Sequence, residues 1–331
     1  MTQRATTVFA LATASLIVSI GVALAGMLSP APERSAGQVY RLTSAVKPLA
    51  PPFLMFETLG PPRAHGRVAM TPATADGTRA LTTLRCSRLS YAGGRGLCLT
   101  EEVREGIVKN VAHVFDRTFR RGARFELPGV ATRVRVAPAG DVAAVTTYAE
   151  EESPSGERLA IETLLIDLRT ARAIADLREF HIDAPGGALT GPFDFASVAF
   201  DRDGDRFFAT LSTPNSRYVV VGSIRNRQLR PIAPDVVSEA LSPDGTRLIV
   251  KRRVGDRAFW ELGVLDLSSL AARRVDQGGR SVDDQVEWLD DDHLLYHDAS
   301  DAGTSIWVVA ADGQSPPRVL VPEAFSPVVV R

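Results

Sequence analysis

The sequence is poor in several residue types on which particular functions depend. Its 331 residues include two cysteines, three lysines and 7% aromatic residues. Basic and acidic side chains number 38 and 39, which gives a formal charge of −1. Because general nucleic-acid binding draws on a basic surplus that displaces counterions, this balance argues against a nucleic-acid partner. Two cysteines separated by eleven residues also form neither a C-x-x-C redox motif nor a four-cysteine zinc site.

The motifs of several common enzyme active sites are also missing. The sequence contains no G-x-S-x-G nucleophile elbow, no phosphate-binding loop, no dinucleotide fingerprint and no H-E-x-x-H zinc motif. The sequence therefore indicates no catalytic residue, no resident metal and no cofactor.

Only the N-terminal part of the chain carries a long apolar run. Residues 8–28 are uncharged and follow Arg4, and as a helix they would span roughly 31 Å, the thickness of a bilayer core. The segment is longer than the apolar region of a usual cleaved signal peptide. This length favours the interpretation that residues 1–29 are a membrane anchor. Ala23-Leu24-Ala25 is a possible cleavage site, so a signal peptide and a secreted product remain the alternative. Both interpretations place the rest of the chain outside the cytoplasm.

Export changes the interpretation of the two cysteines. Cys86 and Cys98 flank Gly93-Gly94, where a hairpin is expected to turn. In an oxidising compartment the two thiols can pair as a disulfide, and two unpaired core cysteines are the alternative.

Beyond the apolar run the pattern changes twice. Residues 30–52 are rich in proline, alanine and polar residues and read as a flexible linker. From Phe53 onward, short apolar runs alternate with turns of Gly, Asp, Asn and Pro, and no helical periodicity persists over three turns. This pattern is typical of strands and tight hairpins.

The turns reveal an internal repeat. Two apolar runs joined by a turn recur, and each pair is followed by a third apolar strand and a fourth, outer one. Gly204 and Gly245 lie 41 residues apart, while Gly222, Asp266 and Ala310 are spaced by 44. A period of this length with four strands per unit is typical of propeller blades. The paired runs begin at residues 133, 198, 239 and 286.

Counting the units predicts the size of the ring. A fifth unit lies at residues 85–128, and the two ends of the chain supply a sixth. Residues 326–331 would form its inner strand, and residues 53–59, 66–72 and 79–84 its other three. We therefore predict an all-β fold in which residues 53–331 form a single six-bladed β-propeller, closed by strands from both ends and preceded by one N-terminal apolar helix.

The blade motifs resemble those of a known family. The segments LSPDGTRLIVKRR (241–253), GVLDLSS (263–269), 282–296 and 305–313 are similar to the blade landmarks of TolB-like propellers, which are exported bacterial proteins. The similarity covers roughly residues 65–331. The TolB protein of the Tol-Pal system carries a mixed α/β domain ahead of its propeller, for which the roughly 30 residues after the apolar run are too few. The resemblance implies an extracytoplasmic propeller that binds another protein. It does not imply that this chain contacts the Pal lipoprotein.

Polar residues just before, or early in, the expected inner strands are the candidate binding residues. In propellers these positions point into the central channel or rim it. A ring of acidic and amide groups there could hold a cation or a basic peptide, while a water-filled polar funnel is the simpler interpretation. The candidates are Arg133, Ser197, Ser238, Glu239, Asp283, Asp284, Gln285 and Glu287.

Two further polar clusters are better explained as turns. The run Asp201–Asp205 lacks the spacing of a calcium loop and aligns with the hairpin turn of the next repeat. His293 and His297 lie on one face of an expected strand near several aspartates, where a solvated hairpin is favoured over a metal cluster.

Three functions are compatible with these features. The favoured one is a non-enzymatic interaction or scaffold module at the cell envelope, with a protein partner and, if residues 8–28 are uncleaved, the membrane. Its contacts could involve the long loops at 149–158 and 181–192. The alternatives are an exported metal-dependent hydrolase or lactonase that uses Glu239, Asp284 and Glu287, and a small-ligand sensor.

Overall fold

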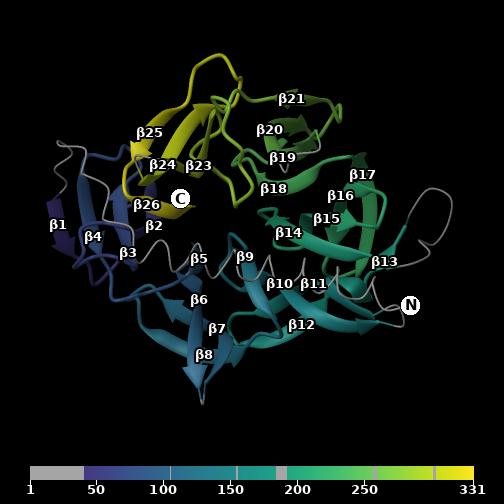
Figure 1. Cartoon of the computed structure of the whole chain (residues 1–331), viewed down its shortest axis with the longest axis horizontal. Helices are drawn as coiled ribbons and strands as arrows, with labels where there is room; N and C mark the ends of the chain where they lie inside the picture. The colour runs from purple at the N-terminus through teal and green to yellow at the C-terminus, as the bar shows by residue number, and fades with distance from the viewer. Residues whose placement is uncertain (1–40, 105, 154–155, 184–191, 256–258, 301–302) are drawn as a thin grey trace, which may run out of the picture. The chain divides into compact units, whose positions relative to one another are not determined.

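The computed structural model describes residues 41–331 except 105, 154–155, 184–191, 256–258 and 301–302. These residues form six β-sheets arranged around a centre, as the predicted six-bladed propeller requires (Figure 1). The structure contains one short 3-10 helix among the described residues, η1 at Leu177–Glu179. The apolar segment 8–28 and the possible cleavage site lie outside the described residues. No helix in the described part of the chain is long and apolar enough to cross a membrane.

Each sheet is one blade, and the strands of a blade follow one another in the chain. Blade 1 consists of β5 (Arg88–Ala92), β6 (Arg95–Arg104), β7 (Ile107–Asp116) and β8 (Arg121–Glu126). Blade 2 consists of β9 (Val130–Val136), β10 (Val142–Ser153), β11 (Gly156–Asp167) and β12 (Arg172–Asp176). Blade 3 consists of β14 (Asp194–Phe200), β15 (Arg206–Ser212), β16 (Arg217–Ser223) and β17 (Gln228–Pro234), with β13 (His181–Ile182) on its outer edge.

The remaining blades include the one that closes the ring. Blade 4 consists of β18 (Val237–Leu241), β19 (Arg247–Val254), β20 (Phe259–Asp266) and β21 (Ala272–Arg274). Blade 5 consists of β22 (Glu287–Trp288), β23 (His293–Ser300), β24 (Gly303–Ala310) and β25 (Arg318–Val321). Blade 6 consists of β26 (Ala324–Val330), β2 (Phe53–Thr58), β3 (Arg67–Pro72), β4 (Thr78–Leu81) and β1 (Arg41–Ser44).

Blade 6 joins the two ends of the described chain. Its inner strand β26 pairs antiparallel with β2, which places Leu54 opposite Val329 and Phe53 opposite Val330. The predicted closure by strands from both ends is confirmed. Residues 41–44, within the segment expected to be a linker, form β1, which pairs parallel with β4 on the outer edge of the same blade.

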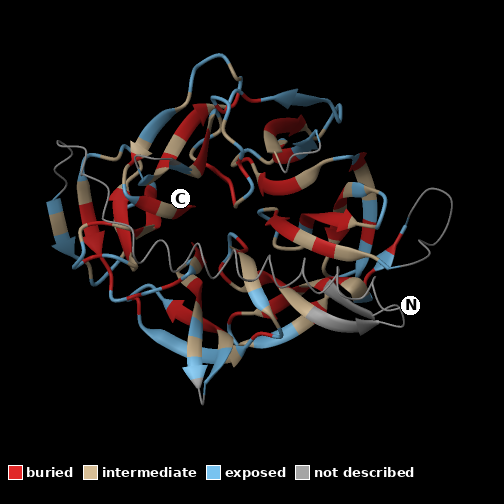
Figure 2. Ribbon diagram, in the orientation of Figure 1, coloured by how far each residue is buried: buried red, intermediate tan, exposed pale blue. Residues whose placement is uncertain are grey.

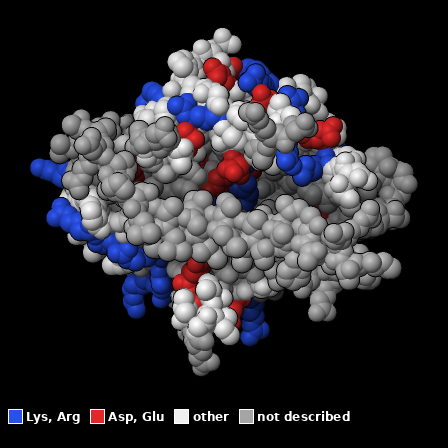
Figure 3. All heavy atoms as spheres, viewed as in Figure 1, with Lys and Arg blue, Asp and Glu red and all other residues white. Residues whose placement is uncertain are grey.

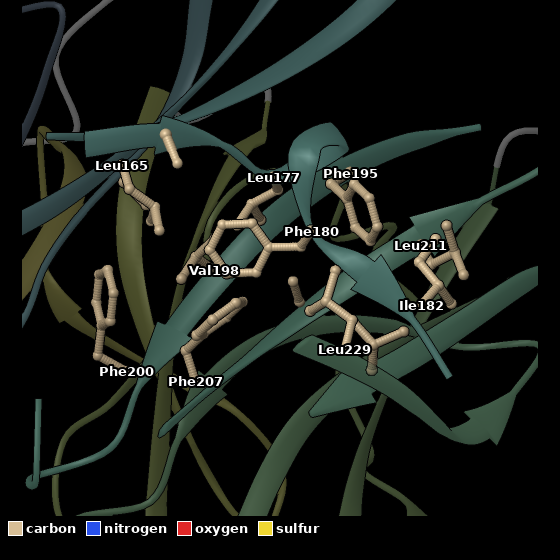
Figure 4. Close-up of a cluster of buried hydrophobic side chains, with 14 of the residues drawn as sticks. Leu165, Leu177, Phe180, Ile182, Phe195, Val198, Phe200, Phe207, Leu211 and Leu229 are labelled. Atoms are coloured by element: carbon tan, nitrogen blue, oxygen red, sulfur yellow. The ribbon is translucent and has the colours of Figure 1, made fainter. Parts of the chain in front are cut away.

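Apolar side chains fill the spaces between neighbouring blades. Because each sheet has two faces to bury, buried residues are found in all six blades around the ring (Figure 2). Between blades 2 and 3, for example, the rings of Phe180 and Phe207 meet edge-to-face with centroids 6.0 Å apart (Figure 4). Each such side chain contributes about 1.5–3 kcal/mol when it is fully buried.

The loops that the sequence analysis singled out belong mostly to the blades. The Oδ1 atom of Asp203 accepts hydrogen bonds from the amides of Asp205 (2.9 Å) and Arg206 (2.8 Å), so the Asp201–Asp205 run is a hairpin turn. In the segment 149–158, residues 149–153 belong to β10 and residues 156–158 to β11, while residues 154–155 lie outside the described residues. In the segment 181–192, residues 181–182 form β13, while 184–191 lie outside the described residues.

The two cysteines lie in blade 1. Cys86 precedes β5, Cys98 is within β6, and a disulfide joins them. Both residues are buried in the core between blades 6 and 1.

Candidate functional site at the central channel

Irregularities in the inner strands direct side chains into the channel. Glu239 is an extra residue in β18, since Ser238 pairs with Val250 and Ala240 pairs with the next residue, Ile249. The register also shifts where β9, β14 and β26 meet their neighbours, and Ser197 in β14 has a left-handed φ of 53°. A bulge of this kind re-aims the side chains around it.

Glu239 forms an ion pair with Lys251 inside the protein. Both side chains are buried, and Lys251 Nζ lies 2.8 Å from Glu239 Oε1. The same ammonium group donates to the backbone carbonyls of Asp283 (2.9 Å) and Asp284 (3.0 Å). Burial lowers the pKa of Lys251 to about 8, although the neighbouring Glu239 carboxylate acts in the opposite direction. Lys251 therefore stays mainly protonated at neutral pH.

Asp284 is the second centre of charge. Its Oδ2 lies 2.6 Å from Arg88 Nη2 and 3.4 Å from His297 Nε2, and its Oδ1 lies 3.5 Å from Arg133 Nη1. The amide of Gln285 also donates to Oδ1 at 2.7 Å. Burial lowers the pKa of His297, against the effect of Asp284, so His297 is neutral at neutral pH.

Arg133 links the two centres. Its Nη2 lies 3.5 Å from Glu239 Oε1 and donates to the carbonyl of Asp283 at 2.9 Å. Arg133, Glu239, Lys251 and Asp284 thus form one continuous network, which we call the channel network together with Arg88 and His297.

Glu287 belongs to a separate ion pair further along the channel. It pairs with Arg135, whose Nη2 also donates to the carbonyl oxygens of Glu239 (3.2 Å) and Val286 (3.4 Å). Burial lowers the pKa of Arg135 to about 10. Beyond this pair lies a cavity of about 240 Å³, lined by the ends of inner strands and by Arg331.

Between the two ion-paired regions is a much smaller space. A cavity of about 10 Å³, close to the size that one water needs, is lined by Arg133, Arg135, Ser197, Glu239 and Gln285, among others. Within the described residues, the Ser197 hydroxyl and Glu239 Oε2 are buried there without a hydrogen-bond partner. Charged and polar side chains therefore leave little free space at this depth of the channel.

The structure brings together most of the candidates proposed from the sequence. Arg133, Glu239 and Asp284 are in the channel network, Asp283 joins it through its carbonyl group, and Ser197 and Gln285 line the small cavity. The side chain of Asp283 is exposed.

Two candidates lie apart from this network. Glu287 pairs with Arg135 instead, and Ser238 is buried with its amide donating to Thr210 Oγ1.

Sequence reasoning missed several members of the network. Lys251 lies on a second strand, β19, whereas the candidates were taken from the expected inner strands. Arg88 lies on the inner strand β5 but was not among the candidates, and His297, on the second strand β23, was interpreted as part of a solvated hairpin. The one signal for Lys251 is that it ends the apolar run Leu248–Val250, where a solvent-facing lysine is not expected. His293 is the first residue of β23, directly after the turn, and its Nδ1 lies 2.9 Å from Asp290 Oδ1. His297, further along β23, is largely buried, with 11% of its side chain exposed, so it is not part of a solvated hairpin.

Each of the three channel carboxylates lies beside a cation of the protein. Acidic and basic side chains lie next to each other near the centre of the ring on the face shown in Figure 3. In the described part of the chain, no three His, Cys, Asp or Glu side chains are grouped so that they could hold a metal ion. Glu239, Asp284 and Glu287 are instead each bound to an arginine or lysine of the protein itself.

Comparison with known proteins rests on the fold alone. No protein-family model matches the sequence. No curated protein sequence matches it either. The structure is similar to the crystal structure of TolB from Acinetobacter baumannii, with 13% identity and a TM-score of 0.59 over 85% of this chain and 67% of that one.

Two other solved structures share the fold at a similarly low sequence identity. One is a nidogen/laminin complex, with 10% identity and a TM-score of 0.51 over 84% of this chain and 97% of that one. The other is an oligogalacturonate lyase in complex with manganese, with 10% identity and a TM-score of 0.50 over 75% and 72% of the two chains. At such identities the similarity describes architecture and not activity. The resemblance to TolB-like propellers is confirmed at the level of the fold: the described residues between 41 and 331 form a six-bladed β-propeller whose structure is similar to that of TolB.

Proposed function

We propose that this chain is a non-enzymatic binding module of the cell envelope, whose propeller presents its loops and channel rim to a protein partner. The observation that carries this proposal is the pairing of the channel carboxylates with the protein's own cations. Lys251 and Arg133 surround Glu239, Arg88 and Arg133 bind Asp284, and Arg135 binds Glu287. Because these carboxylates are already paired inside the protein, a partner is expected to bind at the loops and the channel rim.

The same pairing argues against the hydrolase or lactonase alternative. Its three candidate metal ligands would each have to leave an arginine or lysine before they could bind a cation. Removing one partner of a buried ion pair costs about 3–5 kcal/mol, because the other charge is left buried and uncompensated. The residues present therefore fit a structural network better than a metal centre.

Two features support a location outside the cytoplasm. The apolar run at residues 8–28 is long enough to anchor the chain in a bilayer. The disulfide between Cys86 and Cys98 is of a kind that persists mainly in oxidising compartments. In this proposal the propeller faces the extracytoplasmic side, either tethered by residues 8–28 or released by cleavage near Ala25.

Chemical crosslinking in intact cells tests the proposal. Tagged full-length chain is crosslinked, purified under denaturing conditions and analysed by mass spectrometry. We expect one reproducible envelope protein, with reduced recovery when the rim is changed by Asp283→Arg or when residues 184–191 are replaced by a Gly-Ser segment of equal length. Asp312→Arg, an exposed aspartate in the turn after β24, is the matched control. Recovery of the bait alone in repeated experiments would contradict the proposal.

A further inference from the structure

Another cavity opens between blades 3 and 4 and shares only Lys251 with the channel network. It has a volume of about 360 Å³ and is formed by the turn between β15 and β16, the connection between β17 and β18, and the strands β19 and β20. Trp260 of β20 lines it, so we call it the Trp260 cleft. Lys251 contributes to its lining as well, which places the channel network directly behind it.

The Trp260 cleft has a surplus of positive charge. Arg217, Arg252 and Arg253 line it together with one acidic residue, Asp235, and all four residues are exposed. Arg252 Nη2 lies 3.3 Å from Glu261 Oε2. Among the described residues, by contrast, the guanidinium groups of Arg217 and Arg253 have no hydrogen-bond or ion-pair partner. Two arginines are therefore available for an acidic group from outside.

The backbone of Trp260 is held in place by hydrogen bonds beside these arginines. Its amide donates to Ser281 Oγ at 3.0 Å, and its carbonyl accepts from Gln277 Nε2 (2.6 Å) and from the amide of Val282 (3.2 Å). The ring is partly exposed, and Lys251 Nζ lies 5.8 Å from its centroid. Tryptophan and arginine are the residues that most often dominate the energy of protein interfaces, because a fixed ring loses little freedom on binding.

We propose that the Trp260 cleft binds an acidic peptide segment of a partner protein, with its carboxylates on Arg217 and Arg253 and an apolar side chain against Trp260. The proposal rests on the proposed function and names the chemistry of the partner. The cleft volume is near the lower end of the range for ligand pockets, which suits a few side chains. An anionic polysaccharide fits less well, because its repeated charges need a long basic track that a chain of net charge −1 does not favour.

Fluorescence anisotropy with the purified full-length chain in detergent tests this inference. The probe is a short fluorescein-labelled peptide of Glu, Phe and Gly, compared with a counterpart in which Gln replaces Glu. We expect the acidic peptide to bind at least about tenfold more tightly than its counterpart, and Arg217→Glu/Arg253→Glu to weaken binding by at least about tenfold. Trp260→Leu should weaken the binding of both peptides, because both carry the phenylalanine that would contact the tryptophan ring.

The control is Arg41→Glu/Arg318→Glu, which makes the same charge change at exposed arginines on the edge strands β1 and β25. We expect this control variant to bind both peptides as the unaltered chain does. Thermal melting is used to check that both double variants are folded. Equal affinity for the two peptides, equal losses in the two double variants, or binding of alginate in preference to the acidic peptide would overturn the inference.

Failure of this inference and failure of the proposed function can be distinguished. The crosslinking experiment is repeated with Arg217→Glu/Arg253→Glu in cells. If the unaltered chain captures a partner that the double variant captures equally well, the Trp260 cleft is not its binding site, although the chain still binds a partner. If the unaltered chain captures none, the proposed function itself is wrong.

Discussion

At the scale of the residue, the channel is defined by buried charges that neutralise one another. Lys251 and Glu239 are both almost completely inaccessible to solvent, and their ion pair is only 2.8 Å long. A buried pair of this kind contributes little net stability compared with apolar residues, but it is costly to break. Through Lys251, which also donates to the carbonyls of Asp283 and Asp284, the pair links blade 4 to the segment that leads into blade 5.

Breaking this pair should destabilise the propeller strongly. We expect Lys251→Met to lower the free energy of unfolding by about 3–5 kcal/mol, because the buried Glu239 loses its nearest cation and keeps only the Arg133 guanidinium group, 3.5 Å away. Denaturation in urea measures the change. The double variant Lys251→Met/Glu239→Leu should recover part of the loss. The matched control is Lys109→Met, since Lys109 forms an exposed pair with Glu126 at 2.9 Å that contributes at most about 1 kcal/mol. Equal effects of the two single substitutions would contradict the account.

Acid should destabilise the protein through His297. Its pKa in the folded state is lowered by burial from an ordinary value of 6.5, so below pH 6.5 the unfolded chain takes up the proton more readily. The free energy of unfolding should therefore fall as the pH drops from 6.5 towards 5, and His297→Gln should make the dependence shallower.

The pKa of His113 is also lowered, mainly by burial, so a single substitution removes only part of the pH dependence. Stability curves in urea at several pH values measure it, and His65→Gln, at a largely exposed histidine, is the control. If the free energy of unfolding of His297→Gln depended on pH as steeply as that of the unaltered chain, His297 would not cause the predicted loss of stability in acid.

At the scale of the element, blade 6 decides whether the ring is closed. Its inner strand β26 comes from one end of the described chain and its other strands from the opposite end. Val328, Val329 and Val330 of β26 are buried, two of them against blade 1 and one against blade 5. Without β26 the apolar faces of both neighbouring blades would be exposed to water.

Shortening β26 should therefore unfold the propeller or leave it open. Deletion of residues 326–331 removes three buried valines, each worth about 1.5–3 kcal/mol, together with the strand pairing to β2. Val329→Ala is the graded version, with an expected loss of about 1–2 kcal/mol. Val319→Ala, at a partly exposed valine of the outer strand β25, should change stability by less than about 0.5 kcal/mol. If the truncated chain melted at the same temperature as the unaltered chain, the claim that β26 closes the propeller would be wrong.

The disulfide should contribute to the stability of blade 1. Cys86 and Cys98 are 12 residues apart, and cross-linking a loop of this size restricts the unfolded chain by about 2–3 kcal/mol. We expect Cys86→Ser/Cys98→Ser to lower the free energy of unfolding by that amount, and reductant to have the same effect on the unaltered chain only. Reductant that leaves the unaltered chain as stable as before would contradict this prediction.

At the scale of the whole molecule, the blades were predictable and the channel network was predictable only in part. Blade boundaries follow from short-range turn chemistry, since Asp-Gly turns such as Asp203-Gly204 and Asp244-Gly245 mark hairpins in the sequence itself. The channel network depends on strand register. Glu239 faces inward because β18 carries an extra residue, and Lys251 reaches it from the next strand. Neither a bulge nor a cross-strand contact has a signature in a single sequence.

The central claim is that the channel carboxylates are occupied by the protein's own cations, which leaves binding to the outer surface. Titration calorimetry of the full-length chain with Mn²⁺, Ca²⁺ and Zn²⁺, together with elemental analysis of the chain as purified, tests it most directly. The account predicts no stoichiometric metal and no heat of binding that Asp284→Asn or Glu239→Gln abolishes. One equivalent of metal, lost in either variant, would contradict the account and support a metal-dependent enzyme.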